Sequence, residues 1–322
     1  MFVYLRKIVL SFAAKLVYLA LWLVGLVFYW MPFSIKNFVA KLVSKLWFYI
    51  LRFKVDIVLH NLALVFPRQR EESNKEFRNR IEALAQRNLI HMSLLVFEVL
   101  ERFHWKPSDE GKKYRVVGRE NLDFHFNDPT KGFFSLGAHL GNWELVTLVG
   151  VFSKVRLTIV TRFLRNPFFD ELWVKSRQAF GLELLNESGS GIAIVKAVKR
   201  GRGMGFIFDQ HTGDPHGIES EFLGLKAWSP KGLAIMNRRL KAPIVPCFIL
   251  RDAQGCNVVY LEAPIDFCDE SIGDASRDIA YHVRRCNDTI GKWILENPEQ
   301  YLWLHRRFKN IHDYRQALPW DA

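Results

Sequence analysis

The chain has 322 residues, enough for two small domains or for one large α/β domain with appended segments around a sizeable core. Its formal net charge of +12 indicates an anionic partner, which would be a nucleic acid, an acidic protein or an anionic membrane surface. The four cysteines show neither C-x-x-C nor His/Cys ligand spacing, which argues against a disulfide framework and a cysteine metal site. They are Cys247, Cys256, Cys268 and Cys286.

An uncharged apolar run lies near the start of the chain. It extends over 20 residues from Leu16 to Ile35 and contains Trp22, Tyr29 and Trp30, which are typical of a membrane interface. The run is long enough to cross a bilayer or to lie deep in one leaflet, and it lacks the cleavage site of a signal peptide, the competing interpretation. More basic residues follow the run than precede it, which places the main body in the cytoplasm. We therefore predict that residues 1–36 form a single N-terminal membrane anchor, with an anionic membrane and no nucleic acid as partner.

Helical periodicity follows the apolar run. The apolar residues between Phe38 and Ile50 recur at helical spacing, with lysines on the opposite side. This pattern is typical of an interfacial helix, and equally of an amphipathic helix packed on a domain. Apolar positions from Ile81 to Val99 then predict a long helix between residues 77 and 103, which a proline ends. We predict that residues 37–111 form a helical, membrane-proximal segment.

Short apolar runs alternate with helical segments in the rest of the chain. Such alternation is the pattern of βαβ units, which build parallel sheets covered by helices. We therefore predict an α/β fold for residues 112–322, with a mixed, mostly parallel central sheet flanked by helices. Strands are expected at residues 114–117, 132–136, 157–160, 205–208, 244–250 and 258–261, and helices at 144–152, 167–180, 192–199, 230–237 and 274–296.

The stretch from Gly137 to Glu144, GAHLGNWE, holds the strongest candidate for a catalytic group. His139 would lie on the turn between a buried strand and a helix, where the active sites of α/β proteins gather. Histidine is a suitable base for a hydroxyl nucleophile, and Glu144 would hold the ring and stabilise its charged form. A loop histidine beside a surface glutamate is the alternative for this spacing alone.

Two polar positions follow predicted strands farther along the chain. Arg162 comes soon after the strand at 157–160, ahead of Asn166 and a helix that a proline starts. This position suits a group that grips a phosphate or a developing oxyanion, with a plain surface arginine as the alternative. Asp209 follows the strand at 205–208, but it lacks the second carboxylate that a hard cation needs. We therefore expect Asp209 to have an organising role, without a metal ion or a cofactor.

Several common catalytic motifs are absent from the sequence. It has no G-x-S-x-G nucleophile elbow, no Walker loop and no dinucleotide-binding fingerprint. These absences argue against a serine hydrolase, an NTPase and a nicotinamide enzyme. A base without a protein nucleophile predicts direct transfer to a hydroxyl of a bound substrate.

Five segments, taken in order, resemble the late lipid A biosynthesis acyltransferases, the lauroyl and myristoyl transferases of the glycerolipid acyltransferase superfamily. They are AHLGNWEL around His139, RFLRNP from Arg162, FDQ around Asp209, the FLG…SP segment from Phe222 and NPEQYLWLHRRFK from Asn297. The stretch NLALVFP at residues 61–67 extends the resemblance over nearly the whole chain. Two positions depart from the pattern: Leu223 stands where the family commonly has a second Phe, and Glu144 where much of the superfamily has Asp.

The resemblance implies an inner-membrane enzyme with a cytoplasmic active site that moves an acyl chain from acyl carrier protein to a hydroxyl of a lipid A precursor. It implies that His139 is the base and Glu144 its partner, and that no cofactor takes part. The groups it assigns to the substrate or the oxyanion are Arg162, Asn166 and Asp209. Acidic acyl carrier protein would dock on a basic surface, for which a solvated basic face is the alternative. The candidate docking residues are Arg200, Arg202, Arg238, Arg239 and Lys241.

Two other functions compete with this interpretation. The same chemistry would serve another glycolipid or an amino-acid lipid as acceptor. A non-catalytic, membrane-anchored lipid-binding protein is the alternative from a different class.

Overall fold

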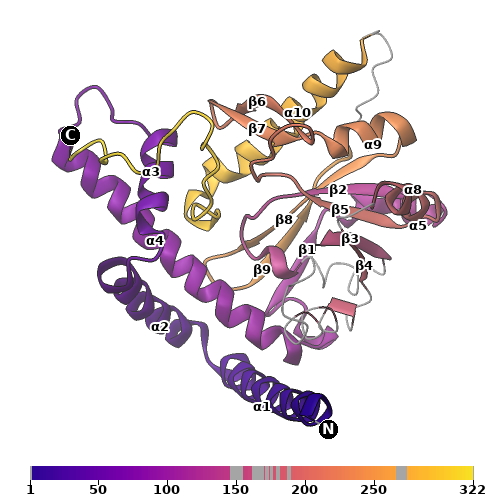
Figure 1. Ribbon diagram of the computed structural model, residues 1–322, viewed down its shortest axis with the longest axis horizontal. Coiled ribbons are helices and arrows are strands. Elements are labelled where there is room, and N and C mark those ends of the chain that lie inside the picture. The colour runs from indigo at the N-terminus through magenta and orange to yellow at the C-terminus, as the bar shows by residue number, and fades with distance from the viewer. Residues whose placement is uncertain are drawn as a thin grey trace.

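A mixed sheet of seven strands forms the centre of the described part of the molecule (Figure 1). The computed structural model describes residues 2–145, 155–161, 170, 174, 177–178, 182–186, 190–265 and 274–321. The strand order is β1-β9-β8-β2-β5-β3-β4, and all neighbours are parallel except β8 and β9. The predicted α/β class with a mixed, mostly parallel sheet is confirmed. The strands are β1 (Tyr114–Val117), β2 (Phe133–Gly137), β3 (Leu157–Thr161), β4 (Glu183–Asn186), β5 (Gly203–Ile207), β8 (Ile244–Arg251) and β9 (Asn257–Leu261).

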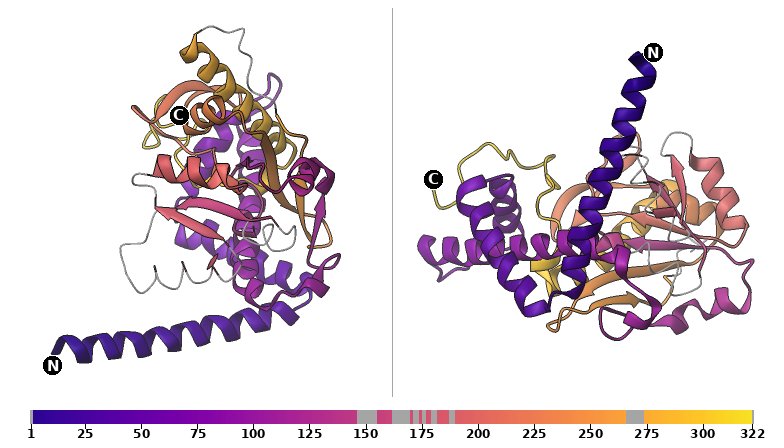
Figure 2. Two further views of the ribbon diagram at one scale, coloured as in Figure 1. Left: turned by 90° about the vertical axis from the view of Figure 1, so that its right-hand side faces the viewer. Right: turned by 90° about the horizontal axis from the view of Figure 1, so that it is seen from below.

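Helices surround this sheet, and a separate antiparallel hairpin lies beside α10. The hairpin consists of β6 (Gly217–Phe222) and β7 (Leu225–Pro230), which were not predicted from the sequence. Figure 2 shows α1 as a long rod that projects from the body of the molecule. The helices are α1 (Phe2–Trp30), α2 (Phe33–Leu46), α3 (Val55–Val65), α4 (Asn74–Glu101), α5 (Asp123–Asn127), α8 (Ser190–Lys199), α9 (Gly232–Leu240) and α10 (Ala275–Glu296).

The central strands are covered on both faces. Successive side chains of a strand point to opposite faces of a sheet. Phe134 and Phe248 accordingly face a core to which α3, α4, α9 and α10 contribute, whereas Phe133 and Cys247 face a second core that includes Trp105. Every position of β2 and β8 is buried for this reason, which explains their nearly continuous apolar sequences.

The long helix α4 connects the N-terminal helices to the sheet domain. A capping box begins it: the Ser73 hydroxyl accepts from the Glu76 backbone N–H at 3.2 Å, and the Glu76 carboxylate accepts from the Ser73 N–H at 2.9 Å. α1 and α2 both pack on α4. The approach of α1 is close at Gly25, where a Cβ would come within 2.3 Å of the Leu100 carbonyl oxygen. The N-terminal helices α1 and α2 are therefore held in place by packing on α4.

A buried ion pair fastens α2 to the end of α4. The Lys36 ammonium binds the Glu101 carboxylate, and both side chains are nearly inaccessible to solvent. Lys113 adds a second cation 3.7 Å from Glu101 and donates to the Tyr29 carbonyl oxygen at 2.8 Å. Removing one partner of a buried pair leaves an uncompensated charge, so these contacts hold the N-terminal helices in one position.

The structure does not support the predicted membrane anchor. The uncharged run from Leu16 to Ile35 is divided between α1 and α2 by Met31 and Pro32, because a residue before proline is disfavoured in a helix. No helix in the described part of the chain combines the length and the apolar character needed to cross a membrane.

Candidate active site

His139 lies at the carboxyl edge of the central sheet, two residues beyond the end of β2. β2 and β5 are parallel neighbours, with Gly137 opposite Ile207. Two residues farther along both strands, His139 therefore meets Asp209, although 70 residues separate the two in the chain. The carboxyl ends of parallel strands are where open α/β sheets bind their ligands. The register of β2 and β5 thus places His139 and Asp209 together where a ligand would bind.

Asp209 holds both the backbone and the ring of His139. Its Oδ1 atom accepts a hydrogen bond from the His139 backbone N–H at 3.0 Å and lies 3.0 Å from the ring nitrogen Nδ1. The Asp209 side chain is 2% exposed and the His139 side chain 18% exposed. Because the carboxylate is an acceptor, the neutral ring carries its hydrogen on Nδ1 and its lone pair on Nε2. Nε2 is therefore the nitrogen able to take a proton from a substrate.

The electrostatics of the pair favour its charged form. Burial lowers the pKa of His139, but the charge and hydrogen bond of Asp209 outweigh burial, so the pKa is raised above its ordinary value. Burial raises the pKa of Asp209, and the charge and hydrogen bonds of His139 bring it below its ordinary value. Asp209 is thus ionised over the pH range in which His139 exchanges its proton, as a group that stabilises imidazolium must be.

Glu144 occupies a different place from the one predicted for it. The imidazole is oriented by the hydrogen bond that Asp209 accepts from it. The Glu144 carboxylate instead binds Arg177 at 2.6 Å and Arg102 at 3.4 Å. Arg102 also donates to the Glu144 carbonyl oxygen at 3.2 Å. The charge of Glu144 still acts on the ring, since it is the smallest of the contributions that raise the pKa of His139. Glu144 therefore belongs to the site as the centre of an arginine cluster.

Two further side chains contact the His139 ring. The amide nitrogen of Gln210, Nε2, lies 3.4 Å from His139 Nε2. The Trp143 ring stands edge-on to the imidazole, with the ring centroids 5.1 Å apart. The Nε2 atom of His139 therefore has an amide beside it, and an aromatic ring lies against the imidazole.

One face of α4 holds the loop that carries His139, residues 138–145, here called the His139 loop. Three polar residues of α4, and Arg102 directly after its end, make these contacts at helical spacing. His91 Nε2 lies 3.2 Å from the Gly141 carbonyl oxygen, and Glu98 accepts from the Asn142 amide at 2.7 Å. Asn88 binds the C-terminal segment beside the loop, and Arg102 binds Glu144. The positions 88, 91, 98 and 102 lie on one side of the helix, because residues three, four and seven apart share a face.

A buried arginine of β8 completes this support. The Arg251 guanidinium donates to Glu98 Oε2 at 2.7 Å and lies 2.9 Å from His91 Nδ1. Burial, and after it the charge of Arg251, lower the pKa of His91 well below its ordinary value, so this histidine is neutral. A neutral ring with its hydrogen on Nε2 donates to Gly141 and accepts from Arg251, which satisfies both nitrogens. This buried network fixes the backbone around His139.

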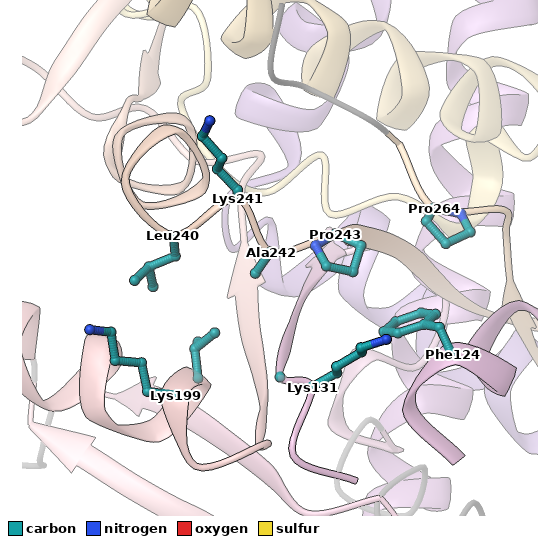
Figure 3. Close-up of a pocket in the computed structure, with 10 residues that line it drawn as sticks. Phe124, Lys131, Lys199, Leu240, Lys241, Ala242, Pro243 and Pro264 are labelled. Carbon is teal, nitrogen blue, oxygen red and sulfur yellow. The ribbon is translucent and has the colours of Figure 1, made fainter. Parts of the chain in front are cut away.

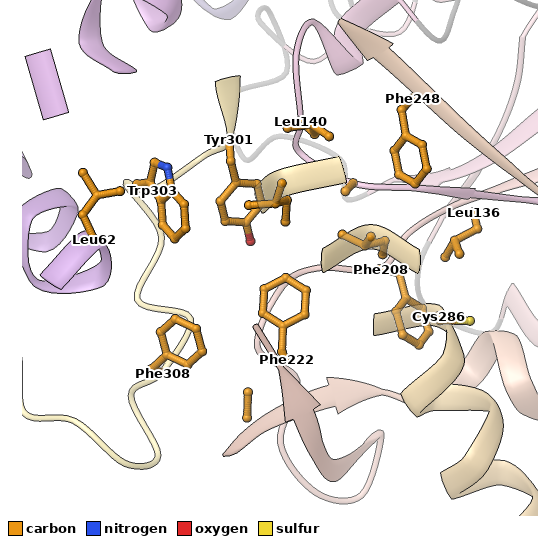
Figure 4. Close-up of a cluster of buried hydrophobic side chains, with 14 of the residues drawn as sticks. Leu62, Leu136, Leu140, Phe208, Phe222, Phe248, Cys286, Tyr301, Trp303 and Phe308 are labelled. Atoms are coloured by element: carbon orange, nitrogen blue, oxygen red, sulfur yellow. The ribbon is translucent and has the colours of Figure 1, made fainter. Parts of the chain in front are cut away.

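The C-terminal segment from residue 299 to residue 308 closes the other side of the His139 loop. The Leu302 N–H donates to the His139 carbonyl oxygen at 3.0 Å, and the Gly141 N–H donates to the Gln300 carbonyl oxygen at 2.8 Å. Figure 4 shows Tyr301, Trp303 and Phe308 of this segment among the buried side chains of the core. The segment thus pairs with the loop as a strand would, and it is anchored by aromatic packing.

Gly141 is required by the geometry of the loop. Its φ of +61° lies in the left-handed region, and a Cβ there would come within 1.6 Å of the Ile249 carbonyl oxygen. We expect Gly141→Ala to lower the free energy of unfolding by about 3 kcal/mol or more, because backbone strain and a backbone clash add. Urea unfolding measures this loss. Gly232→Ala is the matched control, since no atom lies within 4 Å of its Cβ position and α9 begins there, and a similar loss in both variants would contradict the prediction.

The five residues predicted to dock acyl carrier protein lie at the opposite edge of the sheet from His139. α8 leads into β5 and α9 leads into β8, so their carboxyl ends are near the starts of these strands. The length of β2, five residues or roughly 17 Å, separates that edge from the site. Basic residues at helix carboxyl ends are favoured by the helix dipole, which explains most of this cluster without a partner. The residues are Arg200, Arg202, Arg238, Arg239 and Lys241.

Some of these five basic residues also have structural partners. Arg202 pairs with Glu183 at 2.8 Å, and Arg238 pairs with the buried Asp278. Lys241 lines a pocket of about 690 Å³ together with Lys131 and Lys199 (Figure 3). The docking role of these residues stays a prediction.

Two predicted site residues and parts of two predicted helices lie outside the described residues. The residues are Arg162 and Asn166, and the helices are those expected at 144–152 and 167–180. Of the cysteines, Cys247, Cys256 and Cys286 are buried and free, and Cys268 lies outside the described residues.

The sequence argument missed Gln210, the arginines around Glu144 and the polar face of α4. Gln210 stood beside a predicted site residue and was the easiest of these to find. The polar positions of α4 share helical spacing with its apolar ones, a signal that was present in the sequence but was not used.

Comparison with known proteins agrees with the resemblance seen in the sequence. The family model described as bacterial lipid A biosynthesis acyltransferase matches residues 8–310. A lipid A biosynthesis acyltransferase of Haemophilus influenzae is 24% identical over 272 residues, which are 83% of this chain and 81% of the relative. In Escherichia coli, a lipid A biosynthesis palmitoleoyltransferase is 23% identical over 292 residues, covering 88% of this chain and 89% of the relative. A lauroyltransferase of the same organism is 23% identical over 257 residues, covering 80% and 79%.

The family match spans the N-terminal helices, the sheet with its His139–Asp209 pair and the C-terminal segment that supports the His139 loop. Identity to these relatives is low, whereas the aligned region covers about four fifths or more of this chain and of each relative. The chain therefore belongs to the bacterial lipid A biosynthesis acyltransferase family.

Proposed function

We propose that the protein transfers a fatty acyl chain from acyl carrier protein to a hydroxyl of a lipid A precursor, with His139 as general base. The observation that carries this proposal is the Asp209–His139 pair at the carboxyl edge of the sheet, with Nδ1 held and Nε2 presenting its lone pair. The family and the names of its relatives support the lipid A precursor as acceptor. The donor and the mechanism are proposed from the chemistry of the site.

The reaction follows from the state of the ring. His139 Nε2 takes the proton of the acceptor hydroxyl while its oxygen forms a bond to the carbonyl carbon of the acyl thioester. The carbonyl electron pair moves to oxygen and then returns, which breaks the carbon–sulfur bond. The departing thiolate takes the proton from imidazolium, so the base is restored. Asp209 stabilises the imidazolium in between, and this contribution is expected to be part of the 10²–10⁴-fold that a positioned base typically supplies.

Cationic groups beside the pair are suited to the anionic parts of the substrates. Arg102 and Arg177 bind the carboxylate of Glu144 in the His139 loop. We propose that Arg162 and Asn166 also bind a substrate phosphate or the oxyanion. Guanidinium groups bind phosphate by paired hydrogen bonds, which makes them suitable for a phosphorylated glycolipid.

We also propose that the protein associates with an anionic membrane through an N-terminal apolar face. Its side chains are each at least 46% exposed. No Asp or Glu precedes Asp56, whereas eight Lys and Arg lie before it, so apolar burial and attraction to anionic lipid would act together. The face consists of Ile35, Phe38, Leu42, Leu46, Tyr49, Ile50, Leu51 and Phe53.

Serine substitutions test this membrane contact. We expect the triple variant Phe38→Ser, Tyr49→Ser and Ile50→Ser to bind anionic vesicles at least about tenfold more weakly, since each side chain loses apolar area that lipid would bury. Vesicle flotation of the full chain measures the change. Ile311→Ser, at an exposed apolar residue of the C-terminal tail, is the control, and equal binding by all three proteins would rule out this face.

Lipid analysis tests the proposed acceptor. Mass spectrometry of lipids from a strain that lacks the gene should show lipid A short of one acyl chain, restored by the wild-type gene and not by His139→Asn. Unchanged lipid A with another lipid short of an acyl chain would identify a different acceptor. If the purified protein consumed no carrier-bound acyl chain with any lipid acceptor, the enzymatic proposal would fail in favour of a lipid-binding role.

A further inference from the structure

Gln210 lies against the one atom of the site that must receive a proton. Its amide nitrogen is 3.4 Å from His139 Nε2, and Asp209 occupies the other ring nitrogen. The backbone at Gln210 is positioned by its neighbour, because Asp209 is 2% exposed and bonded to the His139 N–H. The Gln210 side chain itself is exposed, so it is able to move while its backbone stays in place.

The chemistry of the two groups determines the direction of this hydrogen bond. A neutral imidazole with its hydrogen on Nδ1 has only a lone pair on Nε2, so the Gln210 amide must donate an N–H to it. An acceptor hydroxyl that gives its proton to His139 must bind the same lone pair. The hydroxyl therefore takes the place of the Gln210 amide at Nε2, and the displaced amide stays next to the bond that forms.

We propose that Gln210 is a catalytic residue whose amide N–H stabilises the oxyanion of the tetrahedral intermediate. This inference rests on the proposed function. The hydroxyl proton goes to His139 Nε2, the new carbon–oxygen bond forms, and the carbonyl electron pair moves to the oxygen that Gln210 binds. Collapse of the intermediate reforms the carbonyl, breaks the carbon–sulfur bond and leaves a thiolate that takes the proton from imidazolium. A neutral donor suits this role, because it stabilises negative charge without competing with the base for its proton.

Kinetics of Gln210→Ala test the catalytic role. We expect kcat to fall about 10²–10³-fold with the KM of the acceptor nearly unchanged, as when one oxyanion donor is removed. The matched control is Gln316→Ala, which removes a similar amide contact, 3.1 Å from Nδ1 of His312 on the C-terminal tail. A kcat of Gln210→Ala equal to that of the control would overturn the inference.

Titration of His139 gives a second readout that needs no acyl transfer. In Gln210→Glu a carboxylate replaces the amide beside Nε2, so the midpoint of the His139 titration, followed by NMR of ¹⁵N-labelled histidine, should move to higher pH. The His139→Asn variant assigns the signal. An unmoved midpoint would show that Gln210 is not beside Nε2, which overturns the inference while leaving the proposed function standing. A shifted midpoint without turnover by the wild-type protein would instead refute the proposed function, and the catalytic role of Gln210 with it.

Discussion

Acyl transfer by the His139→Asn variant is expected to fall about 10²–10⁴-fold, the contribution of a positioned general base. Asparagine has an amide that still donates to Asp209, so the buried carboxylate keeps a hydrogen-bond partner. The amide nitrogen has no lone pair that takes a proton near neutral pH, so the base is lost while the loop is retained. Steady-state rates with carrier-bound acyl chain and vesicle-bound acceptor measure the effect.

His139→Ala provides the comparison for stability. Alanine leaves the buried Asp209 without the ring, so its free energy of unfolding is expected to fall by about 1–3 kcal/mol, whereas His139→Asn should lose less. Both variants should bind vesicles like the wild-type protein, because the N-terminal apolar face is unchanged. Retained turnover in His139→Asn, in a protein that unfolds normally, would remove His139 from the mechanism.

Replacing Asp209 by Asn is expected both to slow the reaction and to move its pH dependence. A base is active when neutral, so the rate rises as the pH increases through the pKa of His139. Asp209 raises that pKa and burial lowers it. Without the carboxylate, burial remains, so the acid limb of kcat/KM should move to lower pH. The plateau should fall by about 10²-fold or more, because the imidazolium formed in the transition state loses its counter-charge.

Glu144→Gln distinguishes the two carboxylates near His139. The structure gives the orienting hydrogen bond to Asp209 and only a smaller charge effect to Glu144. The acid limb should therefore shift less in Glu144→Gln than in Asp209→Asn. A larger shift for Glu144→Gln would restore Glu144 as the partner of the ring.

The fold class could be predicted from local sequence patterns. The apolar runs at residues 132–136 and 244–250 predicted β2 and β8. A strand that is buried on both faces is apolar at nearly every position, so it is easily recognised in the sequence. The hairpin of β6 and β7 escaped prediction because its strands carry charged residues on the exposed side, such as Glu219 and Lys226, and lack an apolar run.

The partner of His139 could not be predicted in the same way. β2 and β5 are neighbours in the sheet, but β3 and β4 come between them in the chain. Without the strand order, the nearest carboxylate in sequence, Glu144, was the natural choice. Asp209 was recognised as a residue at a strand end, and only the register of the sheet brought it to His139. Strand direction likewise places the predicted docking residues at the opposite edge of the sheet from His139, which the sequence patterns alone did not show.

The attachment of the His139 loop to α4 also determines how the site resists local opening. Active-site loops commonly belong to the least stable parts of a protein, which exchange their amide hydrogens through small local fluctuations. Here the Gly141 and Asn142 amides are bonded to Gln300 and to Ile249 of β8, and α4 covers them. Their exchange in deuterated solvent should therefore be as slow as that of β8 itself. The catalytic apparatus and the core would then unfold as one cooperative unit.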